Sequence, residues 1–249
     1  MRSSTVLLTL AASFLELASG HGFINGVRVN GGTWVPGADP VWYYYTAGTS
    51  PKTVGWNSLN QDLGFVQPSA FGTSDIACHK SATAGQLYIS ANAGDTLSLT
   101  WNTWPSDSHK GPLINYLAQC SGECTSASAS ALTWTKIAEN GYNSGTWATD
   151  PLPTSNYTST VKIPSKLKAG NYVLRHEIIA LHGAGSDNGA QNYPQCLNIK
   201  VGGSGTVSLP TGTAGTSLYT RTDPGILFNL YTTFTSYTIP GPALWTGAN

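Results

Sequence analysis

Charged side chains are scarce in this sequence. They make up 10% of the 249 residues, with 12 basic and 12 acidic side chains in balance. A neutral, charge-poor chain has no electrostatic basis for binding nucleic acid or an anionic membrane, so neither is expected as a partner. The shortage of acids also disfavours a hydrolytic glycosidase, which needs two carboxylates about 5–9.5 Å apart. A neutral partner such as a polysaccharide suits this composition.

Methionine and long apolar runs are scarce as well. Met1 is the sole methionine, which disfavours a copper carrier with soft thioether ligands. The apolar stretch at residues 6–15 is too short to span a bilayer of about 30 Å, and no later segment reaches the roughly 20 apolar residues of a membrane helix. Helical periodicity is nearly absent, and only residues 57–63 suggest a helical turn or two.

The first 20 residues have the features of a secretory signal peptide. Arg2 supplies a positive charge, residues 6–15 form a short apolar run, and Ala18, Ser19 and Gly20 are the small residues that a signal peptidase needs. Cleavage after Gly20 predicts a secreted, extracellular chain that begins with His21. We expect residues 21–249 to form a single domain with no appended binding module, and a monomer.

Short alternating segments predict an all-β fold. Strands are expected at residues 27–29, 97–101, 161–163, 172–182 and 196–201, with Gly, Asn and Pro between them. This punctuation is typical of an antiparallel β-sandwich with long loops. Residues 202–215 resemble a flexible linker, but apolar residues follow them, so we expect a long loop that returns to the sandwich.

The four cysteines of an exported chain predict two disulfides, and three pairings are possible. We favour a local Cys120–Cys124 bridge with Cys78–Cys196 as a long-range bridge. A zinc site is the alternative, although CxxxC with two distant cysteines lacks the usual paired spacing. The sequon that begins at Asn156 predicts a glycosylated, exposed loop.

The chain has only five histidines, so a metal site must draw on these: His21, His79, His109, His176 and His182. Cleavage would give His21 a free amine, whose pKa of about 7.7–8.0 lets it release its proton to a metal near neutrality. The amine and Nδ1 of His21 could then chelate one ion, with His109 as the second imidazole. Three nitrogens in a tetragonal arrangement favour Cu(II).

Several other polar residues are candidates for the site or for the core. Tyr193 is either a core tyrosine or a weak axial oxygen ligand. Arg175 and Glu177 lie within an apolar strand, where a structural ion pair is favoured. His182 and Gln191 could donate hydrogen bonds at the open side of a metal.

Two residues beside these candidates have simpler interpretations. His79, next to Cys78, is predicted to be structural. Lys110, beside His109, is interpreted as a solvated lysine, with an influence on substrate contact or regioselectivity as the alternative.

In combination these residues resemble the fungal cellulose-active lytic polysaccharide monooxygenases, formerly a glycoside hydrolase family. The resemblance rests on the start His21-Gly22-Phe23 and on five segments in order: HKGPLINYLAQC at 109–120, LRHEIIALH at 174–182, GAQNYPQC at 189–196, DPGILFNLY and IPGPALW. It covers essentially the whole chain after residue 20.

The resemblance implies an immunoglobulin-like sandwich with a flat binding face and one copper ion in a histidine brace. His21 would bind through its amine and Nδ1, His109 through its side chain, and Tyr193 in the axial position. His182 and Gln191 would lie just outside the ligands. The same disulfides, Cys78–Cys196 and Cys120–Cys124, are implied.

The implied activity is copper-dependent oxidative cleavage of cellulose or a related β-1,4-glucan at C1 and/or C4, with O2 or H2O2 and an external electron donor. On the flat face, Tyr231 and one of Tyr43, Tyr44 or Tyr45 are expected to stack on sugar rings, with Tyr44 preferred. The alternative is a non-catalytic secreted protein that binds carbohydrate or copper.

Overall fold

The computed structural model describes residues 21–44 and 50–249. The predicted signal peptide at residues 1–20 therefore lies outside the described residues. Within the described part, no helix has the length and apolar character needed to cross a membrane.

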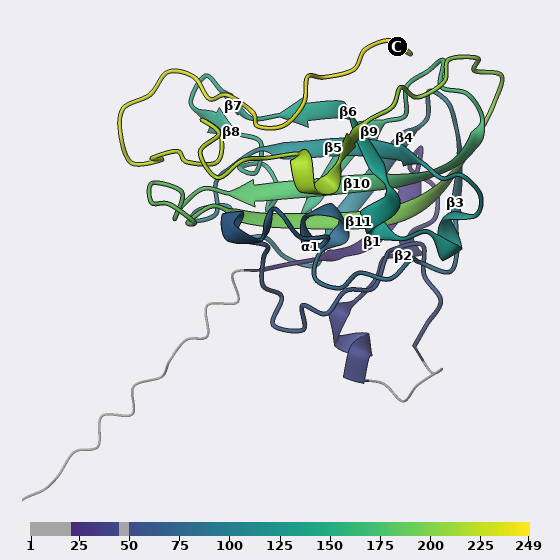
Figure 1. The fold of residues 1–249 in the computed structure, drawn as a ribbon, viewed down its shortest axis with the longest axis horizontal. Coiled ribbons are helices and arrows are strands. Elements are labelled where there is room, and N and C mark those ends of the chain that lie inside the picture. The colour runs from purple at the N-terminus through teal and green to yellow at the C-terminus, as the bar shows by residue number, and fades with distance from the viewer. Residues whose placement is uncertain (1–20, 45–49) are drawn as a thin grey trace, which may run out of the picture.

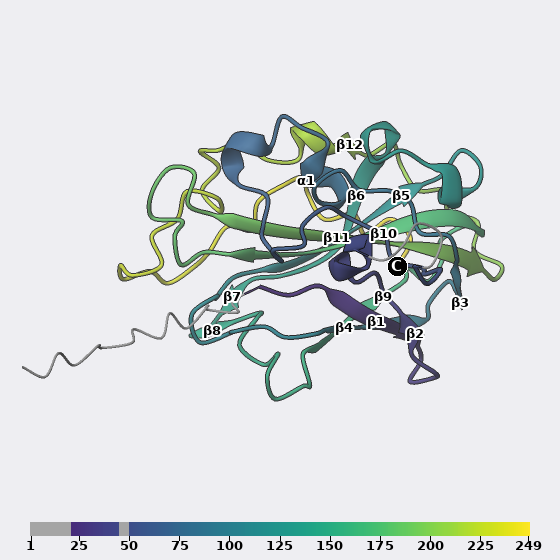
Figure 2. The same cartoon turned by 90° about the horizontal axis from the view of Figure 1, so that it is seen from below.

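Two β-sheets pack face to face (Figures 1 and 2). The four-stranded sheet has the order β2 (Val35–Pro36), β1 (Ile24–Val29), β4 (Thr96–Trp101) and β9 (Thr158–Lys162). The six-stranded sheet has the order β12 (Thr213–Ala214), β6 (Thr133–Asn140), β5 (Leu113–Gln119), β10 (Gly170–Ala180), β11 (Gln191–Gly202) and β3 (Ile89–Asn92). A separate hairpin joins β7 (Tyr142–Asn143) to β8 (Thr146–Trp147). All paired strands are antiparallel except β11 and β3, so the predicted β-sandwich is confirmed.

Helical segments are short and lie in the loops. They are η1 (Pro40–Tyr44), η2 (Pro68–Ala70), α1 (Asp75–Cys78), η3 (Cys124–Ser126), η4 (Ala129–Ala131) and η5 (Gly215–Ser217). The helical turn suggested for residues 57–63 is wrong, because no helix forms there. Asn57 instead forms a β-bridge with Thr83, and the backbone N–H of Leu63 donates to the carbonyl of Asn60 in a turn. The linker-like segment does return to the sandwich, because Val207 bridges to Leu167 and β12 pairs with β6.

The core has two layers because the six-stranded sheet is covered on both faces. Between the sheets, Leu97 and Leu99 of β4 pack with residues such as Ile178, all of them fully buried. On the other face, α1 and the long loops cover Val173 and Ile179. Strand β10 is therefore buried along most of its length, which explains its nearly continuous apolar sequence.

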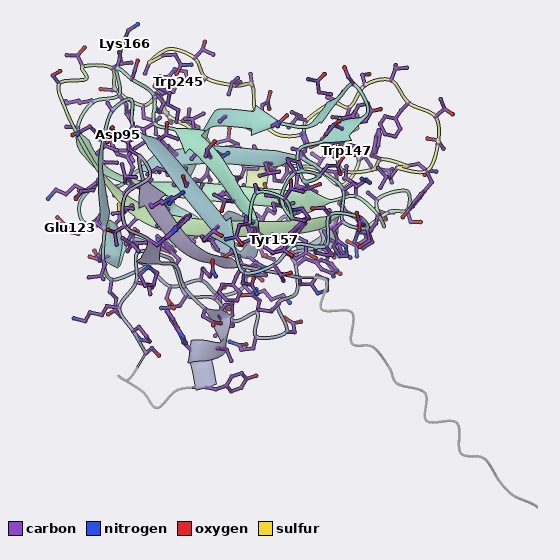
Figure 3. All side chains as sticks on the ribbon, turned by 180° about the vertical axis from the view of Figure 1, so that it is seen from behind. Asp95, Glu123, Trp147, Tyr157, Lys166 and Trp245 are labelled. Carbon is purple, nitrogen blue, oxygen red and sulfur yellow. A yellow bond between two sulfur atoms is a disulfide. The ribbon has the colours of Figure 1, made fainter. Side chains whose placement is uncertain are left out.

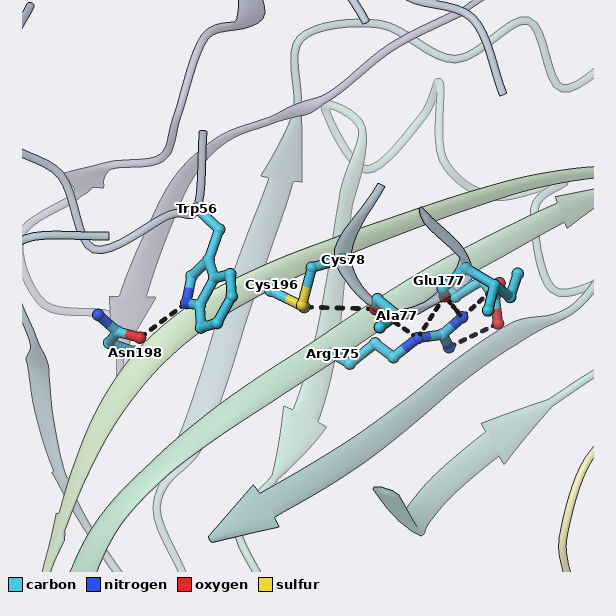
Figure 4. The surroundings of a disulfide bond; sticks show 8 residues. Trp56, Ala77, Cys78, Arg175, Glu177, Cys196 and Asn198 are labelled. Atoms are coloured by element: carbon cyan, nitrogen blue, oxygen red, sulfur yellow. Dashed lines mark hydrogen bonds and ion pairs between the residues drawn. A yellow bond between two sulfur atoms is a disulfide. The ribbon is translucent and has the colours of Figure 1, made fainter. Parts of the chain in front are cut away.

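The polar residues within β10 form a buried structural network (Figure 4). Arg175 donates to both carboxylate oxygens of Glu177 at 2.7 and 2.8 Å, and both side chains are fully buried. Arg175 also donates to the carbonyl of Ala77 at 2.8 Å, and Asn192 donates to Glu177 at 2.9 Å. The structural interpretation of this pair is confirmed, and Glu177 is not available as a hydrolytic carboxylate.

Both expected disulfides are present. Cys78–Cys196 ties α1 to β11 across 118 residues, and Cys120–Cys124 closes a loop of 4 residues. No described cysteine is free. The zinc alternative for these cysteines is therefore excluded.

Candidate metal centre

Four aromatic side chains from separate segments meet at one end of the sandwich. The ring of His21 lies 5.8 Å from that of His109 and 5.7 Å from that of Tyr193, measured between centroids. The ring of His182 lies 4.1 Å from that of His109. The structure thus brings together the residues that the sequence suggested as a metal site, although they span more than 170 positions of the chain.

His21 is held by the residues that follow it. The backbone N–H of Phe23 donates to Oδ1 of Asn102 at 2.8 Å, and the N–H of Asn102 donates to the carbonyl of Phe23 at 3.0 Å. A Cβ atom at Gly22 would lie 2.3 Å from the carbonyl oxygen of Thr103. Glycine is therefore required at position 22, because the chain start packs directly on the backbone that follows β4.

His109 sits in a tight loop between β4 and β5. Its backbone N–H donates to the carbonyl of Pro105 at 2.9 Å, and its carbonyl accepts from Nε1 of Trp104 at 3.1 Å. The hydroxyl of Ser108 lies 2.8 Å from Nδ1 of His109. This contact occupies Nδ1 and leaves Nε2 as the nitrogen that can bind a metal.

The segment after β8 clamps the same loop. The hydroxyl of Thr149 accepts from the N–H of Gly111 at 3.1 Å, and Asp150 accepts from Nζ of Lys110 at 2.7 Å. Lys110 is thus paired and only about one-third exposed, rather than the solvated lysine interpreted from sequence. Sequence reasoning missed Ser108, Thr149 and Asp150, since only the fold brings residues 149 and 150 beside the loop.

Tyr193 enters the cluster from β11. It is fully buried, packs edge-to-face against Trp104 at 5.1 Å, and donates to Oε1 of Gln191 at 2.7 Å. Burial raises the pKa of the Tyr193 phenol well above its usual value. Its oxygen is therefore a neutral, weak donor at neutral pH.

His182 lies just beyond the end of β10. Its Nδ1 is buried and has no hydrogen-bond partner among the described residues. An imidazole nitrogen left unpaired in this way is costly unless a partner arrives, so this atom marks a place where a further polar group fits.

Burial keeps the imidazoles of the cluster neutral. It lowers the pKa of His21, and together with the neighbouring His182 and His21 it lowers the pKa of His109 to about 4. Neutral imidazoles are the form that binds metal. Among the described residues, no group of three or more His, Cys, Asp or Glu side chains could hold a metal. A metal here must combine two imidazoles with other donors. If the chain is cut before His21, the amine of His21 and the Tyr193 oxygen would complete a set that suits Cu(II).

The other two histidines lie apart from the cluster. His79 is buried and its Nε2 lies 2.9 Å from the carbonyl oxygen of Gly64, which confirms its structural interpretation. His176 is buried in the core, with Nδ1 2.7 Å from Oδ1 of Asn115 and Nε2 accepting from Trp101 at 3.2 Å.

The proposed stacking tyrosines lie on separate loops. Tyr231 is 78% exposed and Tyr44 is 70% exposed. In Figures 1 and 2 the start of the described chain lies between η1, which ends at Tyr44, and the yellow loop near residue 231. Tyr45 lies outside the described residues, and the side chain of Tyr43 is not among those described.

Comparison with known proteins identifies relatives over most of the chain. The sequence model of Auxiliary Activity family 9, formerly GH61, matches residues 21–238, so the match begins at His21. An AA9 family lytic polysaccharide monooxygenase F of Malbranchea cinnamomea is 51% identical over 95% of this chain and 97% of its own length. A relative from Thermothelomyces thermophilus, AA9 family lytic polysaccharide monooxygenase H, is 52% identical over 99% of this chain and 71% of its own.

Solved structures of similar proteins superpose closely on this chain. Cel61B of Hypocrea jecorina, described as a glycoside hydrolase family 61 member, superposes with a TM-score of 0.86 at 48% identity, covering 90% of this chain and all of that one. A cellulose-active polysaccharide monooxygenase from M. thermophila superposes with a TM-score of 0.76 at 30% identity, covering 91% of this chain and 99% of that one.

Proposed function

Since this chain belongs to Auxiliary Activity family 9 and is a copper-dependent lytic polysaccharide monooxygenase, we propose that it acts on cellulose or a related β-1,4-glucan at C1 and/or C4. The observation that carries this proposal is that the rings of His109 and Tyr193 each lie within 6 Å of the ring of His21, at the start of the described chain. The cellulose activity of the M. thermophila neighbour supports the choice of substrate.

The copper site depends on processing of the chain. We place a signal peptidase cut between Gly20 and His21, because small residues precede this bond and the family match begins after it. The cut frees the amine that joins Nδ1 of His21 and Nε2 of His109 as the third nitrogen. It also implies a secreted, extracellular enzyme.

Copper held by these groups would supply the redox chemistry, taking electrons from an external reductant and using O2 or H2O2 to oxidise a carbon–hydrogen bond of the glucan. The protein orients the ligands. Ser108 fixes the ring of His109 through Nδ1, and Gln191 fixes the hydroxyl of Tyr193. Because the phenol keeps its proton, Tyr193 would be a neutral, weak oxygen ligand that adds no negative charge to the site.

Two polar side chains lie beside the proposed copper ligands. His182 carries a buried, unpaired Nδ1 beside His109, and Gln191 lies beside the Tyr193 hydroxyl. Both can form a hydrogen bond to a polar group that arrives between them and the substrate. We assign both residues a role in positioning, and His182 a role in proton supply.

A flat aromatic surface suits a crystalline glucan, whose chains cannot be lifted cheaply into a deep cleft. Tyr231 and Tyr44 are exposed, and in Figure 1 the start of the described chain lies between η1 and the yellow loop, so we expect a glucan chain that contacts both tyrosines to pass over His21. Aromatic faces stack on the apolar faces of glucose rings. We therefore assign both tyrosines to substrate binding.

The test is product mass spectrometry with copper-loaded, processed protein on amorphous cellulose, with and without ascorbate. Oxidised cello-oligosaccharides that appear only with ascorbate would support the proposal, and their masses and further fragmentation would assign C1 or C4. Absence of oxidised products on cellulose, with activity on another glucan, would overturn the substrate assignment. Binding of copper or cellulose without oxidised products from any β-glucan would favour the non-catalytic alternative.

A further inference from the structure

The outer face of the four-stranded sheet carries an exposed tryptophan beside the glycosylation sequon. Trp34 is 39% exposed and lines a shallow pocket of about 310 Å³ together with Asn25, Gly26, Thr100 and Asn156. Figure 3 shows this sheet from its outer side, with Tyr157, the residue after Asn156, on it. The pocket lies outside the cluster of His21, and the proposed reaction makes no use of it.

Gly26 and Thr100 lie between Trp34 and Asn156 and connect them. A Cβ atom at Gly26 would lie 3.3 Å from Cε3 of Trp34 and 3.2 Å from Cγ2 of Thr100, so glycine leaves the floor of the pocket open. The hydroxyl of Thr100 donates to the carbonyl oxygen of Asn156 at 3.2 Å. Trp34, Gly26, Thr100 and Asn156 therefore form one continuous surface.

Trp34 is held in place before any ligand arrives. The guanidinium carbon of Arg28 lies 4.4 Å from the centroid of the indole ring, within the range of a cation–π contact. The Nε atom of Arg28 is buried against this surface and has no hydrogen-bond partner among the described residues. A preordered aromatic surface loses little side-chain entropy when a ligand packs on it.

Asn156 has the exposure that a modified asparagine needs. Its backbone is left-handed, with φ of 52°, which asparagine tolerates better than most residues. That conformation alone would account for an asparagine at this position. Two further facts point to modification. Thr158 completes the sequon, and the side-chain amide of Asn156 makes no hydrogen bond to other described residues. The amide nitrogen is thus free for a covalent bond in a pocket with an aromatic wall.

We propose that Asn156 carries an N-linked glycan whose first N-acetylglucosamine packs on the exposed surface of Trp34. Nδ2 of Asn156 bonds to C1 of the first sugar of a lipid-pyrophosphate-linked oligosaccharide, loses one proton and displaces the lipid pyrophosphate. The carbon–hydrogen face of the sugar covers the indole ring, and polar groups of Asn25 and Thr100 lie within the same pocket. The modification requires the export that is part of the proposed function, but it does not depend on copper or on substrate.

The packed sugar would tie the loop before β9 to the sheet. Asn156 lies in the turn that leads into β9, and Trp34 immediately precedes the edge strand β2. A sugar that contacts both bridges the two edges of the four-stranded sheet across β1 and β4. Loss of the contact should therefore reduce stability without any change at the metal site.

The test compares three glycan states in protein secreted by a filamentous fungus: the full glycan, the glycan trimmed by an endoglycosidase to one N-acetylglucosamine, and the Asn156→Gln variant. Each state is prepared with Trp34, with Trp34→Leu and with Trp34→Phe. We expect trimming to leave the thermal midpoint unchanged and Asn156→Gln to lower it by about 2–4 °C, the effect of one lost contact in a domain of this size. In the Trp34→Leu background, Asn156→Gln should leave the thermal midpoint unchanged. In the Trp34→Phe background, Asn156→Gln should lower the midpoint by part of the amount seen with Trp34.

A second measurement needs no variant. In the singly glycosylated protein, NMR signals of the sugar protons should be shifted upfield by the indole ring. An unmodified Asn156 in the secreted protein, unshifted sugar signals, or a midpoint change that is the same with Trp34 and Trp34→Leu would each overturn the proposal. Binding of a soluble glucan at Trp34 of an unmodified protein would assign the pocket to a free ligand and would overturn it as well.

Discussion

Single contacts decide how the proposed copper ligands are presented. Ser108 is the clearest case, because its hydroxyl lies 2.8 Å from Nδ1 of His109 and so fixes which nitrogen faces the metal. We expect Ser108→Ala to weaken copper binding by about 10–100-fold, the usual cost of losing a contact that orients a metal ligand. Isothermal titration with Cu(II) measures this. Ser130→Ala, which alters an exposed serine in η4, is the matched control and should leave affinity unchanged.

His176 should give the protein an acid-sensitive stability. Burial, followed by the charge of Arg175, lowers the pKa of His176 to about 3 in the folded state, whereas the unfolded value is about 6.5. Between these two pH values the unfolded chain holds a proton that the folded chain lacks, so the free energy of unfolding falls as the pH falls below about 6.5.

Replacing His176 isolates this contribution. In His176→Gln the loss of stability between pH 6 and pH 4.5 should be shallower by up to about 1.4 kcal/mol per pH unit, because one titrating group is gone. Denaturant unfolding at several pH values measures the slope. An unchanged slope would show that His176 is protonated in the folded state.

The sequence was informative about the chemistry of single residues. His21 after a predicted cleavage site, together with His109, predicted a metal site whose two imidazoles the structure brings together. The support for these residues was not predictable. Nothing near His109 in the sequence indicates that Thr149 and Asp150 hold its loop, since that contact exists only when the segment after β8 lies against the loop before β5.

At the scale of elements, the loop between β4 and β5 and the chain start are fixed by close backbone packing. We expect Gly22→Ala to displace His21, because a Cβ atom there would lie 2.3 Å from the carbonyl of Thr103. Copper affinity should fall by at least about tenfold. Gly72→Ala is the matched control, since a Cβ atom at Gly72 meets nothing within 4 Å. Equal affinities for the two variants would contradict this role for Gly22.

The two disulfides should differ in their contribution to stability. Cys78–Cys196 closes a loop of 118 residues and Cys120–Cys124 one of 4. Loop-closure entropy predicts losses of about 5 and about 2 kcal/mol when each pair is changed to alanine. Denaturant unfolding of the two double variants compares them. A larger loss from Cys120→Ala with Cys124→Ala would contradict this order.

Strands with clear alternation were predictable, and those without it were not. The alternation at residues 97–101 matches β4, whose side chains face the core on one side only. Strands β5 and β6 were missed, because β5 is buried on both faces and its sequence has no period of two. The strand expected at 172–182 ends at Ala180 in the structure, so His182 lies in the loop that follows, next to the ring of His109.

At the scale of the whole molecule, the exposed tyrosines on either side of His21 should determine adsorption to the substrate. We expect Tyr231→Ala and Tyr44→Ala each to weaken adsorption to cellulose several-fold while copper affinity stays unchanged, since both side chains are largely exposed and neither is a proposed copper ligand. Adsorption isotherms measure this. Leu244→Ala is the control, because Leu244 is exposed but precedes Trp245 at the opposite end of the molecule (Figure 3). Unchanged adsorption in both tyrosine variants would place the substrate elsewhere.

The central claim is that cleavage before His21 creates the copper site. The most direct measurement is Cu(II) titration, with electron paramagnetic resonance, of the processed protein and of a form with one extra glycine before His21. We predict tight binding of one copper with the signature of three equatorial nitrogens in the processed protein, and weak binding with an altered signature in the extended form. Equal affinity and identical spectra for the two forms would contradict the claim.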